Sequence, residues 1–135
     1  MTLDVTVADI GFPALTCSFV VPGHRQWSLR SVVAVVETFP GGQPNRSYAL
    51  SVSNGTDVVA QFGAVDGGTE PATVRITWAD ASNTLVAAGN IATVVAPAPQ
   101  LILPAGYELI VTVVNPAVGD TITSAVAWYD YVETA

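Results

Sequence analysis

The chain has 135 residues and only 11% of them are charged, with eleven carboxylates against four arginines and a net charge of −7. An acidic chain without lysine is a poor ligand for phosphate backbones and anionic membranes, so nucleic-acid and membrane binding are disfavoured. The longest apolar run, residues 32–36, is far shorter than the ~20 residues of a spanning helix. Typical soluble domains carry roughly 25% charged residues, so part of this surface must be apolar or small and polar.

Period-two alternation between turn residues is the dominant pattern along the chain, and it predicts antiparallel strands. In chain order, we expect nine short strands over residues 3–8, 15–21, 27–39, 46–54, 57–62, 72–79, 90–96, 107–115 and 120–132. Asn54-Gly55 is the strongest hairpin signal. No segment has the apolar spacing of a helix; Asp80–Asn83 offers at most one helical turn. The sequence therefore predicts a single domain, 1–135, folded as an all-β antiparallel sandwich with jelly-roll-like character.

The same alternation predicts which side chains form the core. In residues 72–79, Val74, Ile76 and Trp78 share one face, whereas Arg75 lies on the other. The remaining predicted core residues are Leu50, Val52, Leu109, Val111, Val126 and Trp128, with Ile122 and Val132 on the same side of the last strand.

Two predicted strands, 27–39 and 107–114, are apolar on both faces. A sandwich strand needs only one buried face, so a second layer must cover the other. A long loop or another subunit would serve, and the short loops favour a subunit. We therefore expect Val32, Val36 and Ile110 at an interface. Tyr129 and Tyr131, on the predicted outer side of the last strand, suit an interface or a ligand groove, and the enrichment of tyrosine at interfaces favours the former.

Cys17 stands alone, so no intramolecular disulfide is possible, and its apolar neighbours predict a small buried side chain. The N-terminal residues lack the basic and apolar segments of a secretion signal. Both features favour synthesis in a reducing cytoplasm.

Candidate chemistry is sparse. His24 is the only histidine and lies in a turn, without a nucleophile-elbow pattern elsewhere. One cysteine and one histidine do not make a zinc site. Residues 66–70 are acidic but lack the alternating carboxylates of a calcium loop, so a solvated turn is expected. Glu37 and Asp130 lie within apolar strands and are expected at a strand edge or rim. We therefore expect no catalytic, metal or cofactor site, and no enzymatic activity.

Three stretches resemble small β-rich virion proteins of tailed bacteriophages. They are Trp27–Val32, with its early Trp and Arg, Leu101–Leu109, with its Leu-Pro-x-Gly turn, and Gly119–Ile122, with a Gly-Asp turn before the last strand. The resemblance implies a component of the particle: a head decoration (cement) protein, a neck protein or a tail component. It implies no catalytic residues.

The expected function is therefore that of a virion structural protein that decorates and stabilises a capsid. Its expected partners are copies of itself, in a trimer or another closed oligomer, and a major capsid or other virion protein. The alternative is a carbohydrate-binding or adaptor module of a neck, tail or fibre, in which exposed tyrosine or tryptophan rings stack on sugars.

Overall fold

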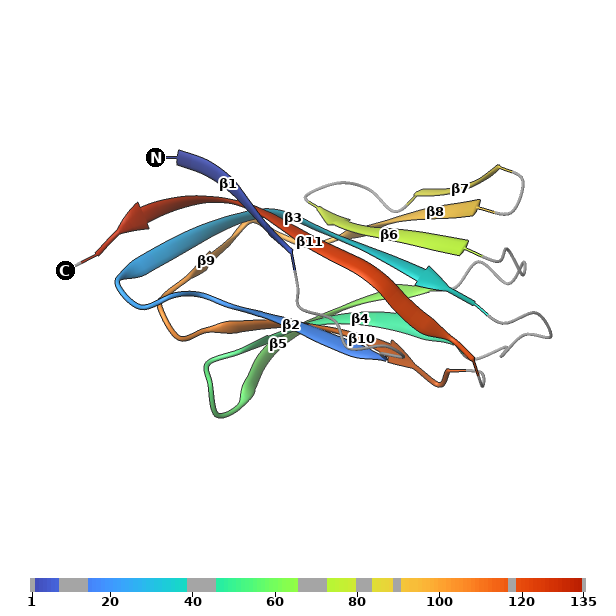
Figure 1. Cartoon of the computed structure of the whole chain (residues 1–135), viewed down its shortest axis with the longest axis horizontal. Coiled ribbons are helices and arrows are strands. Elements are labelled where there is room, and N and C mark those ends of the chain that lie inside the picture. Colours follow the sequence, from blue (N-terminus) through green and yellow to red (C-terminus); the bar gives the residue numbers. More distant parts are fainter. Residues whose placement is uncertain are drawn as a thin grey trace.

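The computed structural model describes residues 2–7, 15–38, 46–65, 73–79, 84–88, 91–116 and 119–134. Within these ranges every regular element is a strand, and the strands form two sheets that pack face to face. Figure 1 shows the two layers, with the start of β1 and the end of β11 at the same end of the upper sheet. The predicted all-β sandwich is confirmed.

The larger sheet, sheet A, has the strand order β1-β11-β3-β6-β8-β7, and β9 also pairs with β3. Its strands are β1 (Thr2–Val7), β3 (Arg25–Glu37), β6 (Thr73–Ala79), β7 (Thr84–Ala88), β8 (Ile91–Pro97), β9 (Leu101–Leu103) and β11 (Thr121–Glu133). The smaller sheet, sheet B, has the order β2-β10-β4-β5. It comprises β2 (Thr16–Val20), β4 (Ser47–Ser53), β5 (Val58–Val65) and β10 (Glu108–Val114). All pairs are antiparallel except β6–β8, which is parallel.

The described residues form eleven strands, two more than the sequence predicts. β9 is only three residues long, and β7 reads Thr-Leu-Val-Ala-Ala, so neither offers a usable alternation of apolar and polar residues. The expected helical turn at 80–83 and the acidic segment 66–70 lie outside the described residues.

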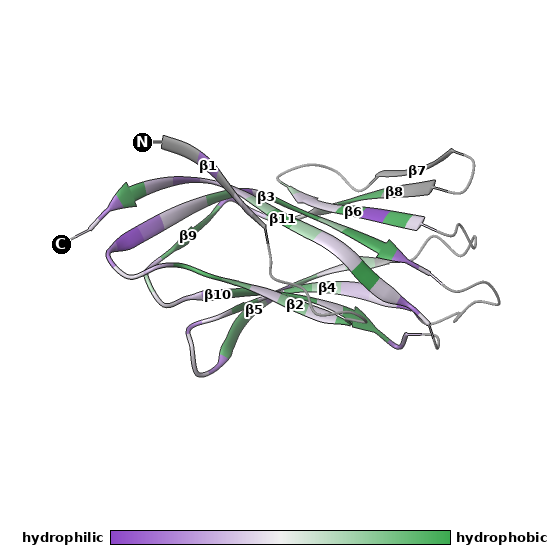
Figure 2. Ribbon diagram, in the orientation of Figure 1, coloured by the Kyte–Doolittle hydropathy of each residue, from purple (hydrophilic) through white to green (hydrophobic). Residues whose placement is uncertain are grey.

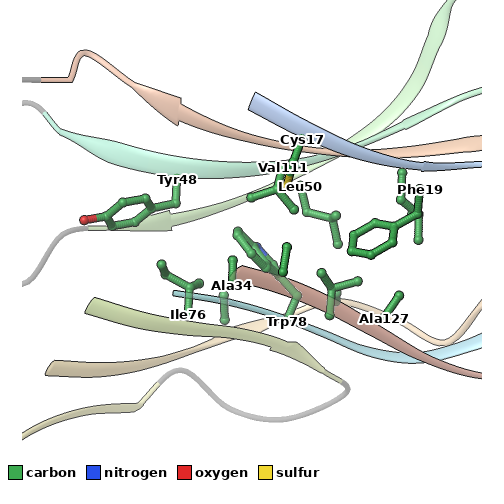
Figure 3. Packing of buried hydrophobic residues seen from close by; sticks show 14 of the residues in the cluster. Cys17, Phe19, Ala34, Tyr48, Leu50, Ile76, Trp78, Val111 and Ala127 are labelled. Carbon is green, nitrogen blue, oxygen red and sulfur yellow. The ribbon is translucent and has the colours of Figure 1, made fainter. Parts of the chain in front are cut away.

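The core lies between the inner faces of the two sheets. In Figure 3, Cys17, Phe19, Leu50 and Val111 of sheet B face Ala34, Ile76, Trp78 and Ala127 of sheet A. Val74, Ile76 and Trp78 are buried and Arg75 is exposed, as predicted. Leu50, Val52, Leu109 and Val111 are buried as well. Inward residues recur at every second position in these strands, so their inner faces are readable from sequence. In β4 the outward Ala49, Ser51 and Ser53 are buried as well.

The last strand differs from its prediction because of a β-bulge. Ile122 pairs with Val36 and Ser124 with Val35, so Thr123 is an extra residue in β11. An extra residue reverses the phase of the strand beyond it. Ile122 is buried, but the later inward side chains are Ala125, Ala127 and Tyr129. The assignment of Val126 and Trp128 to the core is therefore wrong: Val126 is half-buried and Trp128 is 42% exposed, both on the outer face.

A second bulge, in β3, changes which residues of that strand face inward, but it precedes residues 32–36, where Val33 and Val35 remain half-buried on the outer face. Ser31 pairs with Trp128 and Leu29 with Tyr129, so Arg30 is the extra residue. The phase changes there, and Leu29 and Val32 both point inward although they have opposite parity. The expected interface residues Val32 and Val36 are fully buried in the core of the chain itself, so neither presents a surface to a partner.

A buried ion pair links the two sheets at one end of the sandwich. Arg46 precedes β4 of sheet B and Asp120 precedes β11 of sheet A. The Arg46 Nε lies 2.7 Å from Asp120 Oδ2, and Nη2 lies 3.2 Å from Oδ1. Their side chains are 3% and 0% exposed. Two parallel charge-assisted hydrogen bonds fix the relative position of these strand beginnings.

The hairpin predicted at Asn54-Gly55 is confirmed between β4 and β5. The Asn54 side-chain oxygen accepts hydrogen bonds from the backbone N–H groups of Thr56 and Asp57, at 3.0 and 2.9 Å. Gly55 has a φ of 97°, a conformation that L residues with a side chain rarely adopt. The turn residues thus close this hairpin by local interactions alone.

Candidate functional site: two outer sheet faces

The described part of the chain offers little for catalysis or metal binding. His24 is exposed in a turn, with a φ of 63°. Among the described residues, no group of three or more His, Cys, Asp or Glu side chains is placed to hold a metal ion. Cys17 is buried, as predicted, and burial raises the pKa of its thiol to about 11. A thiol with such a pKa remains protonated and unreactive at neutral pH.

The outer face of sheet B is nearly free of charge. The register places its outward residues in rows across β2, β10, β4 and β5. They are Thr16, Ser18, Val20, Glu108, Ile110, Thr112, Val114, Ser47, Ala49, Ser51, Ser53, Val58, Gln61 and Gly63. Of these described residues only Glu108 is charged. The ribbon of sheet B is mostly pale or green in Figure 2, which marks intermediate to apolar hydropathy.

Exposed valines lie at one end of this face. Val20 and Val58 occupy the same row, on opposite edges of the sheet, and are 57% and 58% exposed. Val59, next to Val58, is also exposed. Ile110, the expected interface residue, is half-buried in the neighbouring row between Ser18 and Ser51. We call this set of outward residues the sheet B face.

The outer face of sheet A has a different character. Its most prominent side chain is Trp128, and two residues further along β11 lies Asp130, which is buried and accepts a 2.7 Å hydrogen bond from Arg30 Nε. Ser28 pairs with Asp130 across the sheet and accepts a hydrogen bond of 2.9 Å from the side-chain amide of Gln100. Ile102 of β9 pairs with Ser28 and is 64% exposed. We call these six residues the Trp128 patch.

The two C-terminal tyrosines lie on the inner side of β11, opposite to the predicted side. Tyr129 is buried and stacks on Trp27, with ring centroids 3.8 Å apart. Burial, and then the negative charge of Asp4, raise the pKa of the Tyr129 hydroxyl. Tyr131 is half-buried beneath the Arg25 guanidinium, which lies 4.3 Å from its ring centroid. Tyr129 therefore serves the core, and Tyr131 packs against it.

Sequence reasoning placed Trp128 in the core and found neither the Trp128 patch nor the buried Arg46–Asp120 pair. The bulges at Arg30 and Thr123 determine which residues lie on the outer face of sheet A, and no local sequence pattern marks either bulge. The pair joins residues 74 positions apart, so only the folded chain brings them together.

Comparison with family models, curated proteins and solved structures found no match for this chain. Within the described ranges, the structure contains no helix with the length and apolar character needed to cross a membrane.

Proposed function

We propose that this chain is a non-enzymatic structural protein of a tailed-phage virion, which decorates the capsid and stabilises it through contacts between its own copies and with a shell protein. The observation that carries this proposal is the sheet B face. A chain with a net charge of −7 repels its own copies unless they meet on surfaces that lack charge. Apart from Glu108, the described residues of the sheet B face satisfy that condition.

The composition of the sheet B face also suits a protein contact. Its exposed Val20 and Val58 supply apolar area, and its exposed Thr16, Ser18 and Gln61 supply uncharged polar groups. The fully buried part of a protein interface is typically depleted in charged residues. The resemblance of Trp27–Val32, Leu101–Leu109 and Gly119–Ile122 to virion proteins adds the setting in which such a contact would be used.

A cement protein binds only the assembled lattice, so mass action raises the stability of the shell and not the rate of any reaction. Phage particles made without this chain should therefore assemble but lose their genome at a lower temperature than complete particles. Adding the purified protein back should restore the temperature of genome loss to that of complete particles, whereas protein carrying Val58→Glu should not restore it. Equal thermal stability of complete and deficient particles would contradict the proposal.

A second candidate function, a carbohydrate-binding or adaptor module of the neck, tail or fibre, is favoured by the exposure of Trp128. Deficient particles that are thermally stable but fail to attach to cells would favour this second function over capsid decoration.

A further inference from the structure

We propose that the Trp128 patch is a binding site for a neutral glycan. This inference rests on the second candidate function and deepens it, because it names the residues that would bind the sugar and the class of sugar; it does not depend on the capsid role. Its starting point is an aromatic ring held on a rigid, regular part of the fold. Trp128 lies in the middle of β11, which pairs with β1 on one side and β3 on the other. Strand pairing on both sides fixes the face of the sheet on which the indole lies.

Polar side chains on the same outer face of sheet A are joined by hydrogen bonds to one another. Arg30 binds Asp130 through Nε, which leaves both terminal amino groups of a side chain that is 57% exposed able to donate outward. Gln100 donates to Ser28, which leaves its amide oxygen as an acceptor. Hydrogen-bond donors and acceptors thus lie on the same face of sheet A as the exposed indole of Trp128.

This combination matches the chemistry of a pyranose. One face of a sugar ring carries C–H groups, which pack on the electron-rich face of an indole. Its rim carries hydroxyls, which pair with planar guanidinium, amide and carboxylate groups, and a few such groups suffice to fix orientation. Ile102, which pairs with Ser28 on the side away from Asp130, adds exposed apolar area to the patch.

Charge favours a neutral ligand. Asp130 offsets the charge of Arg30, and the whole chain is acidic, so a polyanionic glycan gains nothing here. A protein partner is the competing occupant, since Trp and Arg are enriched at protein interfaces, whereas the Asp130 carboxylate is of a type depleted there.

The test uses the three tryptophans of the chain. Trp27 and Trp78 are buried, so collisional quenching of fluorescence by acrylamide reports mainly on Trp128. We would screen the purified chain on an array of neutral and acidic bacterial cell-surface oligosaccharides, then titrate each one that binds while measuring quenching. We expect a neutral oligosaccharide to bind and to protect Trp128 from acrylamide. Trp128→Ala should weaken binding at least tenfold, and so should Gln100→Ala, which removes an exposed side chain that the core does not need.

Arg75→Ala, on the same sheet but outside the patch, should leave the affinity unchanged. The proposal is overturned if no oligosaccharide binds, or if Trp128→Ala and Gln100→Ala bind as well as the unaltered chain. It is also overturned if Trp128 becomes protected with rising protein concentration in the absence of sugar, because the patch would then be a contact between copies. None of these results depends on particle stability, so failure here is distinct from failure of the capsid role.

Discussion

Trp78 and Trp128 are tryptophans in two different environments. Trp78 is 1% exposed in the core, whereas Trp128 is 42% exposed on the outer face of sheet A. Buried aromatic side chains dominate core energetics, whereas an exposed ring contributes little to folding. At the scale of single residues, stability in this chain therefore depends on the face of the sheet more than on residue type.

Trp78→Ala should lower the free energy of unfolding by ~3–5 kcal/mol, since it leaves a large cavity in the core. Trp128→Ala and Arg75→Ala, both on the outer face, should each change it by less than ~1 kcal/mol. Denaturant unfolding of the three variants measures this directly. Equal losses for Trp78→Ala and Trp128→Ala would mean that both faces of sheet A are covered.

The buried pair of Arg46 and Asp120 should respond unequally to single and double substitution. Asp120→Ala removes the carboxylate that accepts two hydrogen bonds from the buried Arg46 guanidinium and should destabilise the chain by ~3–5 kcal/mol. Replacing the pair together, as Arg46→Met with Asp120→Leu, removes both charges and should recover most of that loss. Thermal unfolding of both variants is the measurement, and a double variant no more stable than the single one would contradict this account.

Cys17 should contribute a pH-dependent part of the stability at alkaline pH. Burial raises the pKa of its thiol from 9.0 to about 11 in the folded chain, whereas a hydrogen bond with the Val111 backbone lowers it by less. The unfolded thiol ionises first, so the contribution of Cys17 is fully present below pH 9 and is lost as the pH rises toward about 11. The stability advantage of the unaltered chain over Cys17→Ala should therefore shrink between pH 9 and pH 11. An advantage that stays constant over this range would contradict the raised pKa.

At the scale of elements, bulges decide which face of a strand is buried. Thr123 in β11 and Arg30 in β3 are each one residue in excess of the partner strand. If Thr123 paired regularly with β3, the strand would keep its phase after Ile122, and Val126 and Trp128 would face inward. Two small alanines, Ala125 and Ala127, lie inward instead, and Trp78 lies in the same row of sheet A as Ala127, beyond Val32.

The bulge makes one position of β11 dispensable. Deleting Thr123 would give Ile122, Ser124 and Ala125 regular pairing with Val36, Val35 and Ala34, so the inner face is retained. We expect the shortened chain to fold, with a loss of no more than ~1 kcal/mol. Deleting Thr77, in the bulge-free strand β6, should instead turn Trp78 out of the core and prevent folding. Circular dichroism and thermal unfolding show whether each deletion variant folds. If both variants fold, or if neither does, the role assigned to the bulge at Thr123 is contradicted.

At the scale of the whole molecule, the two outer faces divide the surface by chemistry. The sheet B face is nearly uncharged and carries exposed valines, whereas the outer face of sheet A carries Trp128, the Arg30–Asp130 ion pair and, outside the Trp128 patch, Arg75. Like-charge repulsion between acidic copies is smallest where neither copy presents charge. The first face thus suits contacts between copies, and the second suits a ligand with defined hydrogen-bonding groups.

The isolated chain should self-associate through the sheet B face, and sedimentation should detect an oligomer at concentrations of roughly tens of micromolar. Val20→Glu and Val58→Glu should each shift the equilibrium to monomer, because they place carboxylates in the contact. Ile102→Glu, an equally exposed apolar residue on the other sheet, is the matched control and should leave the oligomer intact. A stable monomer of the unaltered chain, or an oligomer disrupted by Ile102→Glu alone, would contradict this assignment.

Regular strands were predictable because an inner and an outer face alternate with a period of two residues. Val74, Ile76 and Trp78, or Leu50 and Val52, needed no tertiary information, and the Asn54-Gly55 hairpin is closed by its own side chain. The sandwich itself follows from these signals. Sequence alone therefore determined the fold class, the absence of a disulfide and most of the core of β4, β6 and β10.

Tertiary structure decided which surfaces are available. A bulge depends on the register with a partner strand, so the exposure of Trp128 and the burial of Val32, Val36 and Tyr129 followed only once β11 and β3 were paired. The Arg46–Asp120 and Arg30–Asp130 pairs join residues 74 and 100 positions apart. The physical reason is the same in each case: local sequence sets the period of a strand, but long-range pairing sets its phase, and the phase determines which side chains reach a partner or a ligand.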